Sequence, residues 1–206
     1  MQGRRLKTGV LISGSGTNLQ ALIDACTTPD YPAEITLVIS NRADAGGLDR
    51  ARQANIPATV ISHKDYTSRE AFDAAIDTAL RAAGVEFVCL AGFMRLLTPG
   101  FVNRWHDRLI NIHPSLLPAF KGIDAVEQAL AAGVQTTGCT VHFVRPEMDT
   151  GPTLLQVEVP VKAGDTSETL HDRIRRAEHQ CYREALRLIA AGKVAVSEET
   201  ATISDN

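Results

Sequence analysis

Strand-like and helix-like segments alternate along the first two thirds of the chain, and this alternation constrains the fold more than any other feature. Strand-like runs lie at 6–13, 35–40, 57–61, 87–93 and 108–113, and the segments between them show helical periodicity. The run FVCLAGF at 87–93 has no polar side chain, as expected of a strand that is buried on both faces. Strands joined by helices in one sheet run parallel, with right-handed crossovers. We therefore predict an α/β fold with a mostly parallel, Rossmann-like sheet flanked by helices.

The pattern changes after Gly133. Residues 136–144 and 153–161 are rich in β-forming side chains with a period of two, and the segment between them is too short for a helix. We therefore predict an antiparallel C-terminal strand pair. A long C-terminal helix is expected over 166–192, and the polar tail 197–206 is expected to fray.

Two local signals mark the starts of helices. Thr67 and Glu70 have the Thr-x-x-Glu spacing of a capping box, at the start of a helix predicted over 68–84. Thr98 followed by Pro99 predicts the start of a short helix, because proline is favoured at the first helical position.

The size and charge of the chain narrow the class of protein. Its 206 residues, 44% hydrophobic and 22% charged, suit a single domain over 1–206. The net charge of −3 and the scattered lysines and arginines do not form the basic surface that nucleic acids require. No apolar run reaches the length of a membrane span or of a signal peptide. The four cysteines form no Cys-x-x-Cys pair and are expected to be free thiols, so we expect a cytoplasmic protein without nucleic-acid or membrane partners.

The sequence SGSGTN at 13–18 follows the first predicted strand and precedes a helix. Small residues let backbone N–H groups approach an anion, and the helix N-terminus adds partial positive charge. Thr17 and Asn18 would add side-chain donors, which favours a small phosphate monoester. A P-loop is excluded, because no Gly-Lys-Ser/Thr follows at the required spacing. Two alternatives stay open: a tight turn without a ligand, and an NADP-dependent oxidoreductase in which Arg42 reads the 2′-phosphate.

Asn111 and His113 end a predicted strand, and their spacing of two places both side chains on one face. Ligands of open parallel sheets lie beyond the carboxyl ends of the strands, so the pair can present an amide and an imidazole to one reacting atom. Asp149 lies in the turn-rich segment before the last strand and can support the imidazole. Taken singly, a buried histidine and a surface turn acid are the alternatives, and His142 is expected to be structural. No His-Glu-x-x-His or Gly-x-Ser-x-Gly motif occurs, so neither a metal site nor a serine hydrolase is predicted.

Five segments together resemble the glycinamide ribonucleotide (phosphoribosylglycinamide) formyltransferase family of purine biosynthesis: SGSGTNLQALI, AGFMRLL, NIHPSLLPAFKG, TVHFV…MDTGP and AEHQCYREAL. The resemblance runs in order from Leu6 to about Gly192 and implies the formyltransferase fold. It implies an enzyme that transfers a formyl group from 10-formyltetrahydrofolate to the amine of 5-phosphoribosylglycinamide, giving formylglycinamide ribonucleotide and tetrahydrofolate on the route to IMP. It also implies a phosphate-binding half at about 1–100 and a catalytic and folate half at about 101–192.

The resemblance implies roles for individual residues. The implied catalytic residues are Asn111, His113 and Asp149. The implied contacts to 5-phosphoribosylglycinamide are Gly16, Thr17, Asn18 and Glu178, and those to folate are Arg69, Met94, Arg95, Leu96, Leu97 and Asn111. The amide and a protonated imidazole would stabilise the oxyanion that forms, with the carboxylate holding the imidazole. No metal is implied, and we expect a monomer or a homodimer with small-molecule substrates.

The chain departs from the family pattern at two positions. Arg183 stands where the family often has a proline after the tyrosine of Glu-His-x-x-Tyr, and Lys121 stands where it often has a proline before a glycine. The first departure lies beside the helix that carries Glu178, which on the sequence alone could be a solvated helical charge.

Three other functions remain as alternatives. A formyltetrahydrofolate hydrolase would use the same three side chains with water as the acceptor, but its relatives carry an N-terminal regulatory domain, whereas here the first strand is expected at Leu6. A methionyl-tRNA formyltransferase would need a further C-terminal domain, for which no room is expected after Gly192. A folate- or nucleotide-binding protein without catalysis would not need the combination of Asn111, His113 and Asp149.

Overall fold

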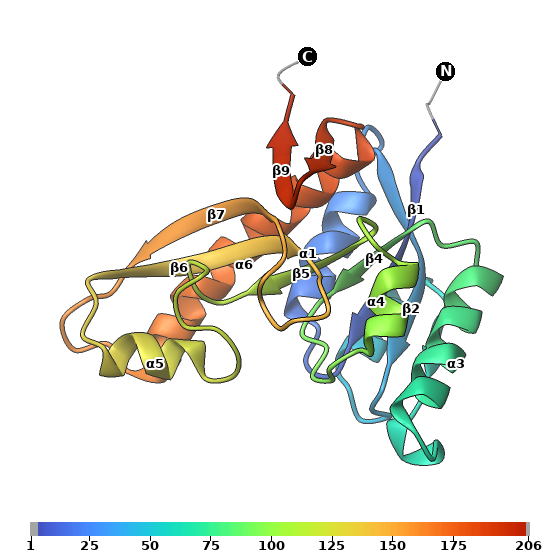
Figure 1. Ribbon diagram of the computed structural model, residues 1–206, viewed down its shortest axis with the longest axis horizontal. Helices are drawn as coiled ribbons and strands as arrows, with labels where there is room; N and C mark the ends of the chain where they lie inside the picture. The colour runs from blue at the N-terminus through green and yellow to red at the C-terminus, as the bar shows by residue number, and fades with distance from the viewer. Residues whose placement is uncertain (1–3, 205–206) are drawn as a thin grey trace. The chain divides into compact units, whose positions relative to one another are not determined.

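The computed structural model describes residues 4–204, which divide into two compact units (Figure 1). The first unit ends at Ile110 and the second begins at Asn111. None of the helices in this described range is long and apolar enough to cross a membrane.

Four parallel strands form the centre of the first unit: β1 (Leu6–Ile12), β2 (Ala33–Ser40), β3 (Ala58–Val60) and β4 (Phe87–Leu90). β1 pairs with β2 on one side and with β4 on the other, and β2 pairs with β3. Val10, Leu11 and Ile12 at the end of β1 have no exposed surface. This burial explains the unbroken apolar run there, because a central parallel strand is covered on both faces.

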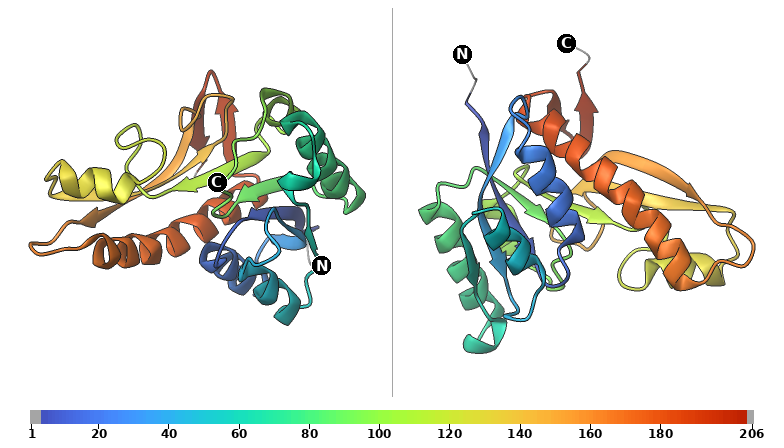
Figure 2. Two further views of the ribbon diagram at one scale, coloured as in Figure 1. Left: turned by 90° about the horizontal axis from the view of Figure 1, so that it is seen from below. Right: turned by 180° about the vertical axis from the view of Figure 1, so that it is seen from behind.

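The connections between these strands are helical: α1 (Thr17–Cys26), α2 (Gly47–Gln53), the 3₁₀ turn η1 (His63–Asp65), α3 (Arg69–Ala82) and α4 (Pro99–Arg104). Within the first unit, α1 and α2 cover one face of the strands and α3 and α4 cover the other (Figure 2). The Thr98 hydroxyl accepts from the backbone N–H of Phe101, which confirms the predicted start of α4.

The cap of α3 differs from the prediction. Ser68 is the N-cap, and its hydroxyl accepts from the backbone N–H of Ala71 at 3.1 Å. The predicted capping box of Thr67 and Glu70 is therefore wrong by one residue. Serine and threonine are both good N-caps, so two adjacent candidates cannot be separated by composition alone.

The second unit contains most of β5 (Leu109–His113), followed by α5 (Ala125–Ala131), β6 (Thr136–Phe143), β7 (Thr153–Pro160) and α6 (Ser167–Ala190). β6 and β7 pair in antiparallel fashion, and α6 packs along both of them (Figure 2). The apolar stripe of α6 includes Leu170, Ile174 and Tyr182, all of them buried.

The strands join in the order β3-β2-β1-β4-β5-β6-β7. The predicted fold class is confirmed, with its mostly parallel sheet, its helices, its antiparallel C-terminal strand pair and its long C-terminal helix.

The chain end was expected to fray, but residues up to 203 form a hairpin. β8 (Val194–Ser197) and β9 (Thr200–Ile203) pair in antiparallel fashion, with Glu198 and Glu199 as the turn. The expectation of a frayed tail is wrong for this range, because cross-strand pairing compensates for the polar composition; residues 205–206 lie outside the described range. No Asn-Gly or Asp-Gly dipeptide marks the turn, so the usual hairpin signal is missing.

Candidate active site

The last residues of β5 place an amide and an imidazole beside the loop that joins β6 and β7. The Nδ1 atom of His113 lies 3.6 Å from Oδ2 of Asp149, at ion-pair distance, and both side chains are largely buried. The Nε2 atom of His113 lies 2.8 Å from the carbonyl oxygen of Phe120. Both ring nitrogens therefore face oxygen acceptors, an arrangement that a doubly protonated imidazolium satisfies.

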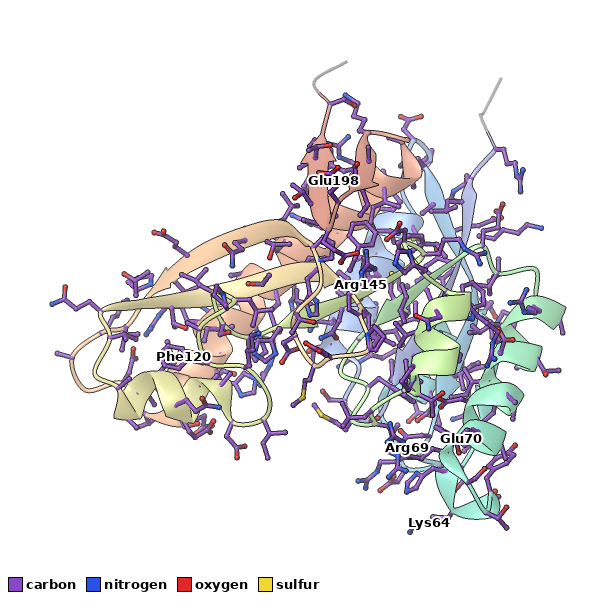
Figure 3. All side chains as sticks on the ribbon, in the orientation of Figure 1. Lys64, Arg69, Glu70, Phe120, Arg145 and Glu198 are labelled. Atoms are coloured by element: carbon purple, nitrogen blue, oxygen red, sulfur yellow. The ribbon has the colours of Figure 1, made fainter. Side chains whose placement is uncertain are left out.

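Two residues with positive φ hold these partners in place. Phe120 has φ 53°, in the left-handed region that bulky side chains rarely adopt, and Asp149 has φ 54°, which aspartate tolerates better. Phe120, labelled in Figure 3, presents its carbonyl to His113 from this conformation. The backbone N–H of Gly122 donates to Oδ2 of Asp149 at 2.8 Å. The segment after β5 thus contacts both the imidazole and the carboxylate, and strain of this kind is characteristic of functional sites.

His142 joins this cluster, although the sequence predicted a structural role for it. Its Nε2 atom lies 3.6 Å from Oδ1 of Asp149 and 3.4 Å from Nδ2 of Asn111. Its Nδ1 atom lies 3.1 Å from the carbonyl oxygen of Phe143, so Nδ1 carries the proton of a neutral ring and Nε2 accepts from the Asn111 amide. Burial lowers the pKa of His142, and this outweighs the raising effect of Asp149 on the same pKa. We assign His142 as a neutral acceptor that orients Asn111.

The sequence did not reveal this contact, because it depends on how distant segments of the chain come together. The register between β6 and β7 shifts between Val141 and His142, where β7 carries one extra residue, Leu154, so the irregularity lies in β7 and the alternation of β6 is kept. The one available signal is a histidine close to the end of a strand that leads into the Asp149 loop.

The first unit holds the predicted phosphate loop. Gly16 is the N-cap of α1 and has φ 72°; a Cβ atom there would lie 2.5 Å from Cα of Gly47. The first turn of α1 begins with Thr17 and Asn18, contains no acidic residue and has no side-chain cap hydrogen bond. This helix N-terminus has the features that bind anions. Gly16 itself is explained by backbone conformation and by the close approach of α2.

The predicted folate segment, residues 94–97, also lies in the first unit and is held by its backbone. The Arg69 guanidinium donates to the carbonyl of Leu96 at 2.7 Å and to that of Leu97 at 3.4 Å. The backbone N–H of Met94 donates to the Ser13 hydroxyl at 2.8 Å. Figure 3 labels Arg69 at the start of α3. Arg69 thus supports the segment rather than standing free.

The side chains of this segment differ in exposure. Met94 and Leu96 are 75% and 62% exposed, Arg95 is partly exposed, and Leu97 is buried. Two exposed apolar side chains, separated by a cation, form a surface suited to a flat ligand with a charged group. Leu97 contributes to the core instead of to that surface.

Glu178 is buried on α6, which excludes the alternative of a solvated helical charge. Its charge acts on Cys139 of β6 and on Cys181 of α6, where it favours the neutral thiols. A binding role for Glu178 stays a prediction.

Arg42 and the acidic, histidine and cysteine side chains bear on two further kinds of site. The guanidinium of Arg42 makes a bidentate ion pair with Asp44, at 3.0 and 2.7 Å, and this pairing lowers the pKa of Asp44. Because the guanidinium of Arg42 is already paired with Asp44, the structure does not favour binding of a 2′-phosphate by Arg42. Within residues 4–204, no group of three or more His, Cys, Asp or Glu side chains could hold a metal ion.

Comparison with known proteins identifies the family of the chain. The formyl transferase family matches residues 6–186 of the chain. Phosphoribosylglycinamide formyltransferase of Haemophilus influenzae is 43% identical over 195 residues, covering 95% of this chain and 92% of that protein. The crystal structure of glycinamide ribonucleotide transformylase 1 from Symbiobacterium toebii has 50% identity and a TM-score of 0.96, and the match covers 99% of this chain and 96% of that one.

Some relatives are much longer. The trifunctional purine biosynthetic protein adenosine-3 of Bos taurus is 53% identical over 198 residues, which cover 96% of this chain but 20% of that protein. The chain therefore spans about a fifth of the length of this trifunctional relative.

Proposed function

The chain belongs to the formyl transferase family, and on this premise we propose that it transfers a formyl group from 10-formyltetrahydrofolate to the amine of 5-phosphoribosylglycinamide. The products are formylglycinamide ribonucleotide and tetrahydrofolate, in the synthesis of IMP. The observation that carries the proposal is the cluster of Asn111, His113 and Asp149, whose donors and acceptor match the needs of acyl transfer.

In the proposed mechanism, the substrate amine attacks the formyl carbon and negative charge develops on the formyl oxygen. The Asn111 amide uses one N–H for His142, and its second N–H is available for the oxyanion. Protonated His113 donates to the same oxygen, and Asp149 stabilises the imidazolium. Each such donor lowers the barrier by about 3–4 kcal/mol. The bond between the formyl carbon and the folate nitrogen then breaks, the amine gives up one proton, and the departing folate nitrogen gains one.

His113 must change its partner for this step. Its Nε2 atom contacts the Phe120 carbonyl, a position that the developing oxyanion would take over. Exchange of one acceptor for another keeps the imidazolium hydrogen-bonded throughout. The strained backbone of Phe120 is suited to such a change, because it lies in a sparsely populated conformation.

We assign binding roles on the same basis. Thr17 and Asn18 would bind the phosphate of the ribonucleotide together with the backbone at Gly16, and buried Glu178 would contact the glycinamide portion. The proposed folate contacts are Asn111, Arg69, Met94, Arg95, Leu96 and Leu97, with Arg69 and Leu97 acting through the shape of the segment.

The proposal also covers the cellular location, the partners, the oligomeric state and the metal requirement of the enzyme. The four cysteines are free and buried, as suits a reducing cytoplasm. We propose small-molecule substrates without nucleic-acid or membrane partners, a monomer or homodimer, and catalysis without a metal.

The test is an assay of the purified protein with 10-formyltetrahydrofolate, with and without 5-phosphoribosylglycinamide. We expect tetrahydrofolate to form only when the ribonucleotide is present, in equal amount to the formylated product. Tetrahydrofolate formed without the acceptor would identify a hydrolase, and no turnover in either case would contradict the proposed function.

A further inference from the structure

The turn of the β8–β9 hairpin departs from the preference of tight hairpins. Its two residues, Glu198 and Glu199, have φ 48° and 57°. Two-residue turns with two positive φ angles favour Asn-Gly or glycine, because a Cβ atom is disfavoured in this conformation. A local rule that is broken at one position indicates that the side chain there serves another purpose.

The side chain of Glu199 reaches a largely buried cation. Its Oε2 atom lies 2.6 Å from Nε of Arg145; the Arg145 side chain is 9% exposed and that of Glu199 is 61% exposed. Figure 3 labels Arg145 just after β6 and Glu198 at the hairpin turn. β9 also packs against β7. The hairpin therefore contacts the β6–β7 connection, which carries Asp149, within a single unit.

Arg145 lies at the start of the loop that joins β6 to β7 and carries Asp149, residues 144–152, which we call the Asp149 loop. Between the two ends of this loop, the backbone N–H of Phe143 donates to the carbonyl of Pro152 at 2.9 Å. A Cβ atom on Gly151 would lie 1.8 Å from the Phe143 carbonyl oxygen and 3.1 Å from Cγ of Arg145. The stem of Arg145 is thus packed on the returning chain, and its guanidinium is held by the hairpin.

We propose that the β8–β9 hairpin clamps the Asp149 loop, with Glu199 as a positioning residue that acts through Arg145. The inference rests on the proposed function, because it assigns to the hairpin the placement of a carboxylate that contacts both His113 and His142. Glu199 is largely exposed and Arg145 largely buried, so solvent screens this ion pair only in part, and the proposal concerns the placement of Asp149.

The test compares two glycine variants of the full chain. Glu199→Gly removes the carboxylate and relieves the positive φ, whereas the matched control Glu198→Gly relieves the neighbouring φ and keeps the ion pair. We expect kcat to fall about five- to tenfold in Glu199→Gly, because small displacements of a catalytic group are costly, while the KM for 5-phosphoribosylglycinamide stays within about twofold. Amide hydrogen exchange of residues 144–152 should accelerate in Glu199→Gly alone.

A third variant provides the rescue. Glu199→Gln keeps an oxygen acceptor for Arg145 and should recover at least half of the lost kcat. Equal kcat in the two glycine variants, or unchanged exchange of 144–152 in Glu199→Gly, would overturn the clamp. A wild-type protein without formyl transfer would overturn the proposed function instead, and the exchange measurement would then test the clamp independently.

Discussion

Asp149 is the residue on which the site depends most, because its carboxylate lies at ion-pair distance from His113 and accepts from the backbone N–H of Gly122. We expect Asp149→Asn and His113→Ala each to lower kcat by about a hundred- to a thousandfold, since each removes part of one stabilising unit. The double variant should cost far less than the product of the two losses. A double-mutant cycle on kcat measures this coupling, and simple multiplication of the losses would show that the two residues act independently.

His142 predicts a pH dependence of stability. Its pKa is lowered from 6.5 by burial, so the unfolded chain binds a proton near pH 6 that the folded chain does not bind. The contribution of this group to stability is therefore present above pH 6.5 and is lost as the pH falls below it. Between pH 7.5 and 5.5, His142→Gln should lose less thermal stability than the wild type.

Exposed His171 provides the control for that measurement, because His171→Gln removes a histidine that is not buried. Its loss of Tm between the two pH values should equal that of the wild type. If His142→Gln also loses as much as the wild type, His142 is not the group responsible.

Substitutions at two glycines of the phosphate loop should have different effects, one on the binding of 5-phosphoribosylglycinamide and one on stability. A Cβ atom on Gly14 would meet nothing within 4 Å, so Gly14→Ala should keep the wild-type Tm and raise the KM for 5-phosphoribosylglycinamide at least fivefold, with the folate KM unchanged. Gly16→Ala should destabilise the fold by about 1–3 kcal/mol through its positive φ and its contact with Gly47. Steady-state kinetics and thermal unfolding measure the two effects, and an equal rise of both KM values in Gly14→Ala would contradict a phosphate role.

At the level of helices and strands, the correction of the α3 cap can be tested by stability alone. Ser68→Ala should lower the free energy of unfolding by about 1 kcal/mol, because it removes the acceptor for the Ala71 amide. Thr67→Ala, one residue earlier, should change it by less than about 0.5 kcal/mol. Denaturant unfolding of both variants distinguishes the two caps, and the reverse order would restore the Thr67 cap.

The elements differ in how far they could be predicted. The parallel core was predictable, because β1 and β4 are covered on both faces and their sequences carry that burial directly. The β8–β9 hairpin was not, since its turn uses two glutamates and its strands have only four residues each. Pairing between distant segments decides such cases, and pairing leaves little trace in local composition.

For the whole molecule, the arrangement of the candidate site was partly predictable. The spacing of Asn111 and His113 places them together, and the resemblance to a family added Asp149. The contact of His142 with Asn111 and Asp149 depends on how distant segments come together, and the contact of Phe120 with His113 required a left-handed backbone, neither of which periodicity reveals. The catalytic and binding roles themselves stay predictions that the assays above decide.

The four buried cysteines make the protein a reporter of its own unfolding. Cys26 and Cys89 belong to the first unit, Cys139 and Cys181 to the second, and all four thiols are shielded. A maleimide added under native conditions should therefore modify each thiol only when its surroundings open. Mass spectrometry of the labelled peptides, over a series of urea concentrations, would give a separate opening free energy for each unit. If the labelling of the two pairs of cysteines depends on urea in the same way, the two units unfold together. If it differs, the pair that is labelled at the lower urea concentration belongs to the less stable unit.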